Sequence, residues 1–200
     1  MVTSFGKSAT LDVTEIARRP LKVDECALLV VDIQERLIPH MFNCEAVGRN
    51  AQLLARLAKI FDLPVVVTTQ YAKGLGPIIP EMSALLPPVP HIDKLEFNAF
   101  ANSAVASAVK ALPSKCNTLL LTGMEAHVCV TQSALGALNQ GYIVHVASDC
   151  IASRVESNWR IAQERMRAAG CIISSTEMIM YELLGRSGTP EFKEILKYVK

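Results

Sequence analysis

The sequence predicts an α/β fold, a three-layer α-β-α sandwich with a six-stranded parallel sheet, from two observations. Six short runs are apolar at almost every position, as in strands that are buried on both faces. A helical pattern follows each run, which is typical of parallel strands joined by crossover helices. The chain has 200 residues, of which 50% are hydrophobic, so residues 1–200 are expected to form a single domain with a sizeable core.

The first half of the chain is expected to supply three strands and one long helix. The first strand covers residues 26–32, and a helix with apolar residues at helical spacing covers about 44–61. The second strand covers 65–70, and the third lies around 92–95. Between these two strands, the stretch 73–90 holds five prolines. We therefore expect a long surface loop there, of the kind that often covers a site.

The second half repeats the alternation of helix and strand up to the C-terminus. Gly141 and Gly170 each follow a helical pattern, at the place where glycine commonly ends a helix. The expected elements are helices at about 99–112, 128–139 and 157–169, strands at 118–122, 142–147 and 171–174, and two short helices within 176–200.

The charge balance disfavours a dedicated nucleic-acid-binding protein. Lys and Arg number 20 and Asp and Glu number 19, for a net charge of +1, so there is no basic excess to hold a phosphate backbone. The longest apolar stretches fall far short of the ~20 residues that cross a bilayer, so no membrane partner is expected. A small-molecule substrate is the partner that remains.

Residues 1–22 are expected to form a peripheral N-terminal arm. This segment lacks the apolar region of a secretory signal, and its acidic residues Asp12 and Glu15 argue against a mitochondrial transit peptide. The six cysteines include no C-x-x-C pair, as expected of free thiols in a reducing compartment. The sequence therefore predicts an intracellular protein, cytoplasmic rather than mitochondrial.

Three ionisable residues of complementary type follow different predicted strands. Asp32 ends the first strand, Lys94 lies in the third, and Cys129 stands at the start of the helix that follows the strand 118–122. Right-handed crossovers bring the carboxyl ends of parallel strands to one edge, where active sites form in such folds. Taken singly, the three are a turn-capping carboxylate, a solvated lysine and a core thiol, and only their combination indicates chemistry.

A thiol, a carboxylate and an ammonium group together suit nucleophilic catalysis. Free cysteine has a pKa of about 8.5, so a base or a nearby positive charge is needed to form the thiolate. Asp32 can accept the thiol proton, and Lys94 can balance the charge. We therefore expect Cys129, of all six cysteines, to be the accessible and acidic one.

The residues around these three positions resemble the isochorismatase-like cysteine hydrolase superfamily. The stretches that carry the resemblance are LLVVDIQERL, DKLEFNAF and LLLTGMEAHVCVTQSALGAL, within a region from about Cys26 to about Thr176. The resemblance implies a six-stranded parallel sheet with helices on both sides. It also implies an Asp–Lys–Cys catalytic triad, which falls on Asp32, Lys94 and Cys129 of this chain.

In this superfamily the loop before the nucleophile carries a non-proline cis peptide bond, which by position falls on Met124–Glu125. The resemblance implies that this bond turns the backbone N–H groups of Glu125 and Cys129 toward one point. Those two donors would form the oxyanion hole for a tetrahedral intermediate.

The chain departs from two branches of the superfamily. Nicotinamidases carry an Asp-x-His element and further histidines for a metal, but here the stretch reads TTQYAKG, with no histidine between His40 and His91. We therefore expect no metal, no other cofactor and no nicotinamidase activity. The branch that cleaves the vinyl ether of isochorismate works without a cysteine nucleophile, so Cys129 disfavours that reaction. The stretch QYAKGLGP is similar to the metal-free "isochorismatase domain-containing" group.

Six further residues near the strand ends are candidate substrate contacts, namely Gln34, Leu37, Gln70, Tyr71, Phe97 and Phe100. Gln34 has two other possible roles, as a helix cap or as a partner of Asp32, and the apolar members suit the core equally well. His127 lies close to Cys129, but histidine at the start of a helix is usually solvated, and the family reserves the base role for the aspartate.

Two classes of function remain. The first is a cysteine hydrolase that acts on an amide-like or related C–N bond of a small molecule through a covalent intermediate. The second is a protein that keeps the fold but acts through partners, in binding or in RNA metabolism as a ribonuclease-like protein. The complete triad favours the first.

The apolar stretches 176–184 and 192–198 predict a homo-oligomer, with burial in the chain's own core as the alternative.

Overall fold

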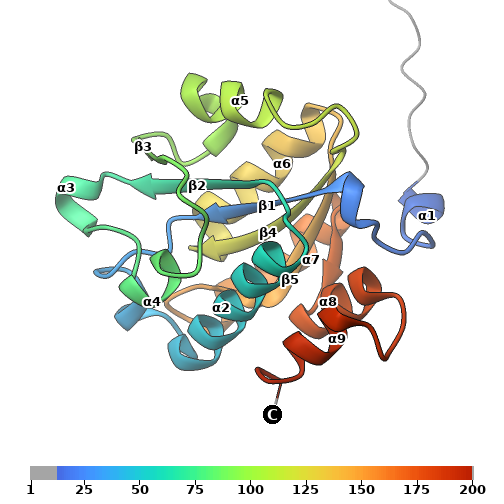
Figure 1. The fold of residues 1–200 in the computed structure, drawn as a ribbon. Coiled ribbons are helices and arrows are strands. Elements are labelled where there is room, and N and C mark those ends of the chain that lie inside the picture. Colours follow the sequence, from blue (N-terminus) through green and yellow to red (C-terminus); the bar gives the residue numbers. More distant parts are fainter. Residues whose placement is uncertain (1–12, 200) are drawn as a thin grey trace, which may run out of the picture.

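Six parallel strands in the order β3-β2-β1-β4-β5-β6 form the centre of the computed structural model, which describes residues 13–199 (Figure 1). Their bounds are β1 Cys26–Val31, β2 Val65–Gln70, β3 His91–Lys94, β4 Thr118–Met124, β5 Ile143–Ala152 and β6 Ile172–Ser174. All neighbouring pairs are parallel, which confirms the predicted sheet. The order reverses direction between β1 and β4, and the carboxyl ends at such a switch point form the usual ligand site of α/β sheets.

Helices cover both faces of the sheet and complete the predicted three layers (Figure 1). The first face carries α2 (Cys44–Ile60), α4 (Pro80–Ser83), α8 (Thr176–Leu184) and α9 (Pro190–Ile195), and the second carries α5 (Ser103–Lys110), α6 (Thr131–Asn139) and α7 (Glu156–Ala168). Successive residues of β1 alternate between the two cores: Leu28 packs into the first core and Leu29 into the second. This two-sided burial explains why β1 is apolar at every position.

The spacing of apolar residues in α2 accounts for its place on the sheet. Val47, Ala51, Leu54 and Ala58 recur three or four positions apart and are buried, so they form one stripe that faces the core. α2 therefore lies along the sheet, where it contacts β5 and also α8 and α9.

The stretch 73–90 differs from the predicted surface loop. It contains two short helices, α3 (Ala72–Leu75) and α4, and its side chains Ile78 and Met82 are buried in the first core. Backbone hydrogen bonds also join it to the segment after β1, from Glu35 N to Pro77 O and from Ile79 N to Ile33 O. One of the five prolines, Pro80, is the first residue of α4, a position where proline is compatible with a helix, so the proline content did not exclude a helix here.

Several predicted boundaries also need correction. The helix expected at 99–112 is a 3-10 turn, η3 (Ala99–Ala101), followed by α5, because the Asn102 side chain accepts the N–H groups of Ala104 and Val105 and starts a new helix. The strand expected at 142–147 continues to Ala152 through an irregularity opposite β4. A five-residue π-helical turn, η4 (Ala126–Val130), precedes α6 where one helix from 128 to 139 was expected.

The first and last helices of the described residues lie outside the alternation of strands and helices. Residues 1–12 of the predicted arm lie outside the described part; α1 (Val13–Ile16) follows, and the Leu21 N–H donates to the Glu182 carboxylate of α8 at 3.0 Å. Most of the apolar stripe of α8 faces the chain's own core, while Met178 and Tyr181 stay exposed at 52% and 48%. Within residues 13–199, no helix is long and apolar enough to cross a membrane.

Candidate active site

The three predicted site residues come together at the carboxyl edge of the sheet. Asp32 follows β1, Lys94 ends β3, and Cys129 lies in the turn η4 that follows β4. All three are buried, with exposed fractions of 0% for Asp32, 2% for Lys94 and 6% for Cys129. The fold therefore gathers a carboxylate, an ammonium group and a thiol from three segments at the switch point of the sheet.

Asp32 is held by contacts to β2 on both its backbone and its side chain. Its N–H donates to Thr68 O at 3.2 Å, and its carboxylate oxygen Oδ1 accepts from Thr68 Oγ1 at 2.7 Å. The parallel register that pairs Val31 with Thr68 places these groups side by side. Asp32 has φ of 55°, in the left-handed region where aspartate is tolerated better than most residues, and this turns the chain sharply at the end of β1.

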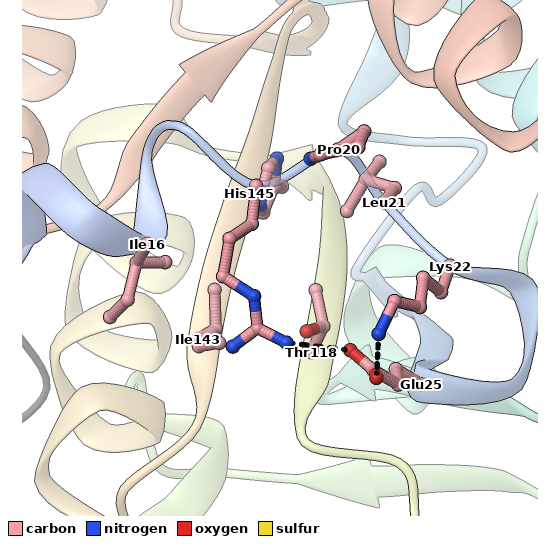
Figure 2. A pocket seen from close by; sticks show the side chains of 9 residues that line it. Ile16, Pro20, Leu21, Lys22, Glu25, Thr118, Ile143 and His145 are labelled. Carbon is pink, nitrogen blue, oxygen red and sulfur yellow. Dashed lines mark hydrogen bonds and ion pairs between the residues drawn. The ribbon is translucent and has the colours of Figure 1, made fainter. Parts of the chain in front are cut away.

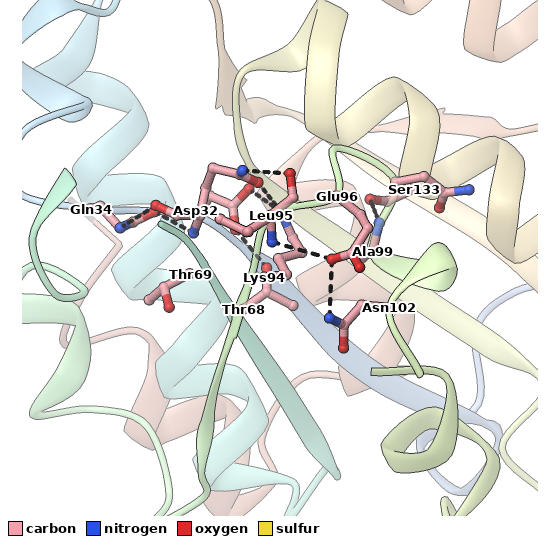
Figure 3. A network of polar contacts seen from close by, with 12 residues as sticks. Asp32, Gln34, Thr68, Thr69, Lys94, Leu95, Glu96, Ala99, Asn102 and Ser133 are labelled. Atoms are coloured by element: carbon pink, nitrogen blue, oxygen red, sulfur yellow. Dashed lines mark hydrogen bonds and ion pairs between the residues drawn. The ribbon is translucent and has the colours of Figure 1, made fainter. Parts of the chain in front are cut away.

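Lys94 connects the carboxylate to the neighbouring strand. Its ammonium donates to Asp32 Oδ2 at 2.7 Å and to Gln70 Oε1 at 2.9 Å, and both charged side chains are fully shielded from solvent (Figure 3). The register pairs Gln70 of β2 with Lys94 of β3, which brings the amide beside the ammonium. The two charges thus meet their hydrogen-bonding needs inside the protein, the condition on which a buried ion pair is stable.

Cys129 is a buried thiol, contrary to the prediction that it is the accessible and acidic cysteine. Burial is the largest cause that raises its pKa to about 12; the Asp32 carboxylate raises that pKa as well, by its charge and as a hydrogen-bond partner, and the Lys94 ammonium opposes these effects. Burial and the charge of Asp32 together outweigh the effect of Lys94 on the pKa of the thiol. Cys44, which is partly exposed, is the more accessible thiol.

The sequence around Cys129 brings the two strands β1 and β4 unusually close. Gly123 has φ of 146°, and a Cβ atom there would lie 2.1 Å from Val31 O, so only glycine fits at this point of β4. The Met124–Glu125 peptide bond, which begins at the next residue, has the non-proline cis geometry that the resemblance implied. The Glu125 carboxylate then accepts from Arg154 Nε at 2.9 Å at the rim of the site.

The predicted substrate contacts fall into two groups. Gln34 is fully buried and uses its amide for backbone partners: Nε2 donates to Gln70 O and Gly76 O, and Oε1 accepts from Gln70 N. Gln34 therefore ties the end of β1 to the end of β2 and to the stretch that follows. Leu37 and Phe100 are partly buried and pack against the first and the second core respectively.

Tyr71 and Phe97 form the second group and are exposed at 49% and 53%. Both follow strand ends next to Lys94, since Tyr71 N donates to Lys94 O at 3.0 Å. Leu95, which directly follows β3, is exposed at 70% and is a further apolar residue of this region that the sequence pattern did not single out. Exposed large apolar side chains next to a buried charged pair are suited to contact a ligand.

Thr68 and His127 have polar partners that the sequence did not predict. Thr68 reads as an ordinary β-branched strand residue, and only the register reveals that its hydroxyl holds Asp32. His127, considered as a partner of Cys129, has its Nδ1 at 2.9 Å from the Ser153 hydroxyl.

The part of the chain that the structure describes contains no group of three or more His, Cys, Asp or Glu residues that could hold a metal ion.

A pocket at the opposite edge of the sheet is separate from this site. Figure 2 shows it at the amino ends of β4 and β5, where Thr118, Ile143 and His145 contribute to its lining. Its volume is about 20 Å³, which has room for about one water molecule. His145 is buried there, and desolvation lowers its pKa to about 4.

Comparison with known proteins gives consistent likenesses over most of the chain. The isochorismatase domain family matches residues 26–178. A secreted isochorismatase effector, Isc1 of Phytophthora sojae, is 36% identical over 86% of this chain and 83% of its own length. Isochorismatase domain-containing protein 2 of Danio rerio is 34% identical over 85% of this chain and 84% of its own length.

Solved structures give the same picture. The MAR1 ribonuclease of Caenorhabditis elegans has a TM-score of 0.84 at 31% identity and covers 90% of this chain and 92% of its own. YcaC of Escherichia coli, described as an octameric hydrolase of unknown specificity, has a TM-score of 0.84 at 29% identity, with 90% of both chains covered. YcaC of Pseudomonas aeruginosa, solved with covalent acrylamide, has a TM-score of 0.84 at 29% identity and covers 90% of this chain and 92% of its own.

Proposed function

The chain belongs to the isochorismatase family of hydrolases, and from that premise we propose that it cleaves an amide-like C–N bond of a small molecule with Cys129 as the nucleophile. In this proposal Asp32 is the general base and acid, and Lys94 balances the charge. The observation that carries the proposal is the ion pair of 2.7 Å between Lys94 Nζ and Asp32 Oδ2, buried beside the Cys129 thiol.

The raised pKa of Cys129 fits a thiol that loses its proton only during the reaction. Loss of the proton to solvent is unfavourable because it would leave a buried negative charge, and because this charge would be the second one beside Asp32. Transfer of the same proton from Cys129 to Asp32 leaves the site's net charge unchanged, and the new thiolate then lies near the Lys94 ammonium. In this step the proton therefore stays between the thiol and the carboxylate and is not released to solvent.

The first half of the proposed reaction forms a thioester. As Asp32 takes the thiol proton, the sulfur of Cys129 attacks the carbonyl carbon and the carbonyl π electrons move to oxygen. The N–H groups of Glu125 and Cys129 are the proposed donors to this oxyanion. When the oxyanion collapses, the C–N bond breaks, Asp32 returns the proton to the departing nitrogen, and the free amine leaves.

The second half restores the enzyme. A water molecule gives a proton to Asp32 and attacks the thioester carbon, and a second tetrahedral oxyanion forms. Collapse then breaks the C–S bond, the carboxylic acid leaves, and the Cys129 sulfur regains its proton from Asp32. No metal or cofactor is needed, because the protein supplies the nucleophile, the base and the oxyanion donors.

The substrate is proposed to bind at the strand ends next to Lys94. Tyr71 and Phe97 are the proposed apolar walls, since their exposed rings stand beside the buried charged pair. Gln34, Gln70, Leu37 and Phe100 stay predicted substrate contacts, and their observed partners give them structural roles in addition. The covalent acrylamide in the Pseudomonas aeruginosa YcaC structure supports an amide-sized ligand for a relative.

A second candidate is RNA cleavage, which the likeness to the Caenorhabditis elegans MAR1 ribonuclease favours. The net charge of +1 argues against it, because binding of a phosphate backbone relies on Lys and Arg. Incubation with labelled single-stranded RNA separates the two candidates. Cleavage that Cys129→Ala and Asp32→Asn both abolish would favour the ribonuclease.

We also propose an oligomeric state and a cellular location for the protein. A homo-oligomer is proposed from Met178 and Tyr181, exposed on α8, and from the octameric relative YcaC. An intracellular location is proposed from the six free cysteines, although the Isc1 relative is described as secreted. Light scattering at micromolar concentration tests the assembly, and a monomer mass would contradict it.

Intact-protein mass spectrometry after incubation with a mixed library of small amides tests the proposed reaction. The expected result is an acyl adduct that maps to Cys129 and is absent from Cys129→Ala. Cys171→Ala is the matched control, because burial alone raises the pKa of that thiol to about 12 and no charged group acts on it. An adduct that persists in Cys129→Ala would contradict the proposal.

A further inference from the structure

Gln70 contacts the Lys94 ammonium directly, in a way that the predicted role as a substrate contact does not explain. Its side-chain oxygen Oε1 accepts from Lys94 Nζ at 2.9 Å, and its side-chain nitrogen Nε2 donates to Leu95 O at 2.9 Å. We propose that Gln70 is a positioning residue, which holds the Lys94 ammonium in place beside Asp32 and so fixes the position of this positive charge relative to Cys129. This inference rests on the proposed function.

The chemistry of the two partners fixes the orientation of the Gln70 amide. A carboxamide carries two N–H donors on one side and a carbonyl acceptor on the other. The reverse orientation would place N–H groups against the ammonium and a carbonyl against the carbonyl of Leu95, so both contacts would be repulsive. Only the orientation with Oε1 toward Lys94 satisfies both partners.

The backbone of Gln70 is held just as firmly, by Gln34. The Gln34 side chain accepts from Gln70 N at 2.8 Å and donates to Gln70 O at 3.1 Å, so one side-chain amide binds both the backbone N–H and the backbone carbonyl of Gln70. Gln34 is itself anchored, since its Nε2 also donates to Gly76 O. A fully buried side chain with three such bonds leaves Gln70 little freedom to shift.

Two fixed acceptors determine the direction of the third N–H bond of Lys94. An ammonium has three N–H bonds at tetrahedral angles, and two of them point at Asp32 Oδ2 and Gln70 Oε1. Two hydrogen bonds therefore fix the position of Nζ. With Asp32 alone as a partner, the Lys94 side chain could pivot about one hydrogen bond, and the position of its charge relative to Cys129 would vary.

A neutral partner is also required at this position. Asp32 and Lys94 form one negative and one positive charge, so the site is neutral with Cys129 as a thiol. A carboxylate in place of Gln70 would give the ammonium two anionic partners and the site a net negative charge. Thiolate formation would then be opposed more strongly, so glutamine supplies an acceptor without this electrostatic penalty.

The test is the rate at which iodoacetamide alkylates Cys129 between pH 6 and 9, read by peptide mass spectrometry. The thiolate sulfur forms a bond to the CH₂ carbon, the C–I bond breaks and iodide leaves, so the rate follows the thiolate population. Gln70→Glu is expected to slow alkylation about tenfold at each pH, as for a rise of about one unit in the thiol pKa. Gln140→Glu makes the same change at an exposed position after α6 and should leave the rate unchanged.

Gln70→Met keeps the length of the side chain and the net charge but removes the acceptor, and it is expected to slow alkylation by a smaller factor without changing the pH dependence. A wild-type rate in Gln70→Glu or in Gln70→Met would overturn the inference, and Gln70→Met decides alone if Gln70→Glu does not fold. Lys94→Met is measured in parallel. If it is alkylated as fast as the wild type, the proposed function fails; if it is slow while both Gln70 variants match the wild type, only the role of Gln70 fails.

Discussion

The Lys94 ammonium lies 2.7 Å from the Asp32 carboxylate, and neither side chain is exposed to solvent. Removal of one partner would leave the other as an uncompensated buried charge, which typically costs about 3–5 kcal/mol. Lys94→Met should therefore lower the free energy of unfolding by about that amount, as measured by denaturant titration. Lys115→Met removes an exposed ion pair with Asp24 and should change it by less than about 1 kcal/mol.

The double variant Asp32→Asn/Lys94→Met provides the internal check on that prediction. It contains no unpaired charge, so it should be more stable than Lys94→Met alone. If Lys94→Met unfolds at the wild-type denaturant concentration, the two residues are not the buried pair that the structure places at the sheet edge.

Two adjacent threonines of β2 allow a matched comparison. Thr68 Oγ1 donates to the buried Asp32 carboxylate at 2.7 Å, whereas Thr69 Oγ1 donates at 2.9 Å to Asp93, which is exposed. A hydrogen bond to a buried charge contributes about 1.5–3 kcal/mol, more than one to a group that water can solvate. Thr68→Val should therefore destabilise the protein more than Thr69→Val in thermal unfolding. Equal losses would show that the Thr68 hydroxyl does not hold Asp32.

His145 is buried at the sheet edge opposite the candidate site, and it should make the free energy of unfolding depend on pH. Burial lowers its pKa to about 4, so the folded state binds the proton less readily than the unfolded state, where histidine titrates near 6.5. The stabilisation is present above about pH 6.5 and is lost as the pH falls toward 4, by about 3 kcal/mol in all. Unfolding titrations at several pH values should show this loss.

His145→Gln should lack this part of the acid dependence, because glutamine does not titrate. His40→Gln changes an exposed histidine and should keep the wild-type slope. Parallel pH profiles for wild type and His145→Gln would contradict the assignment of the slope to His145.

Asp32→Asn should abolish turnover of whichever amide the library identifies. Loss of a general base typically costs about 10²–10⁴ in rate, and asparagine cannot accept the thiol proton. Asp62→Asn is the matched control, because Asp62 also has a left-handed backbone, with φ of 53°, but is exposed and far along the chain from the site. Full activity in Asp32→Asn would remove Asp32 from the mechanism.

The sequence was sufficient for the sheet and for the convergence of the three site residues. Apolar runs alternate with helical patterns, as is typical of parallel strands joined by crossover helices, and the carboxyl ends of such strands share one edge. The convergence of Asp32, Lys94 and Cys129 followed from that rule together with the resemblance. Individual tertiary contacts could not be predicted from the sequence. Nothing local distinguishes Thr68 from other strand residues. The burial of Ile78 and Met82 depends on partners that are far away in the sequence.

The electrostatic state of Cys129 was the part of the site that the sequence predicted wrongly. A thiol beside an ammonium was expected to be acidic, but the ammonium is paired with Asp32 and the thiol is buried. The pKa of a group depends on the balance of desolvation and neighbouring charges, and that balance requires distances and burial.

The most direct test of the central claim is the rate of Cys129 alkylation by acrylamide at pH 7.5 in three proteins, with Cys171 of the same chain as the buried reference thiol. The site electrostatics predict opposite signs for two substitutions. Asp32→Asn removes a charge that raises the pKa of Cys129 and should speed alkylation even as turnover is lost, whereas Lys94→Met removes the opposing charge and should slow it. Cys171 should react equally slowly in all three. Equal Cys129 rates in the three proteins, or a rate for Cys129 no higher than that for Cys171 in Asp32→Asn, would contradict the account.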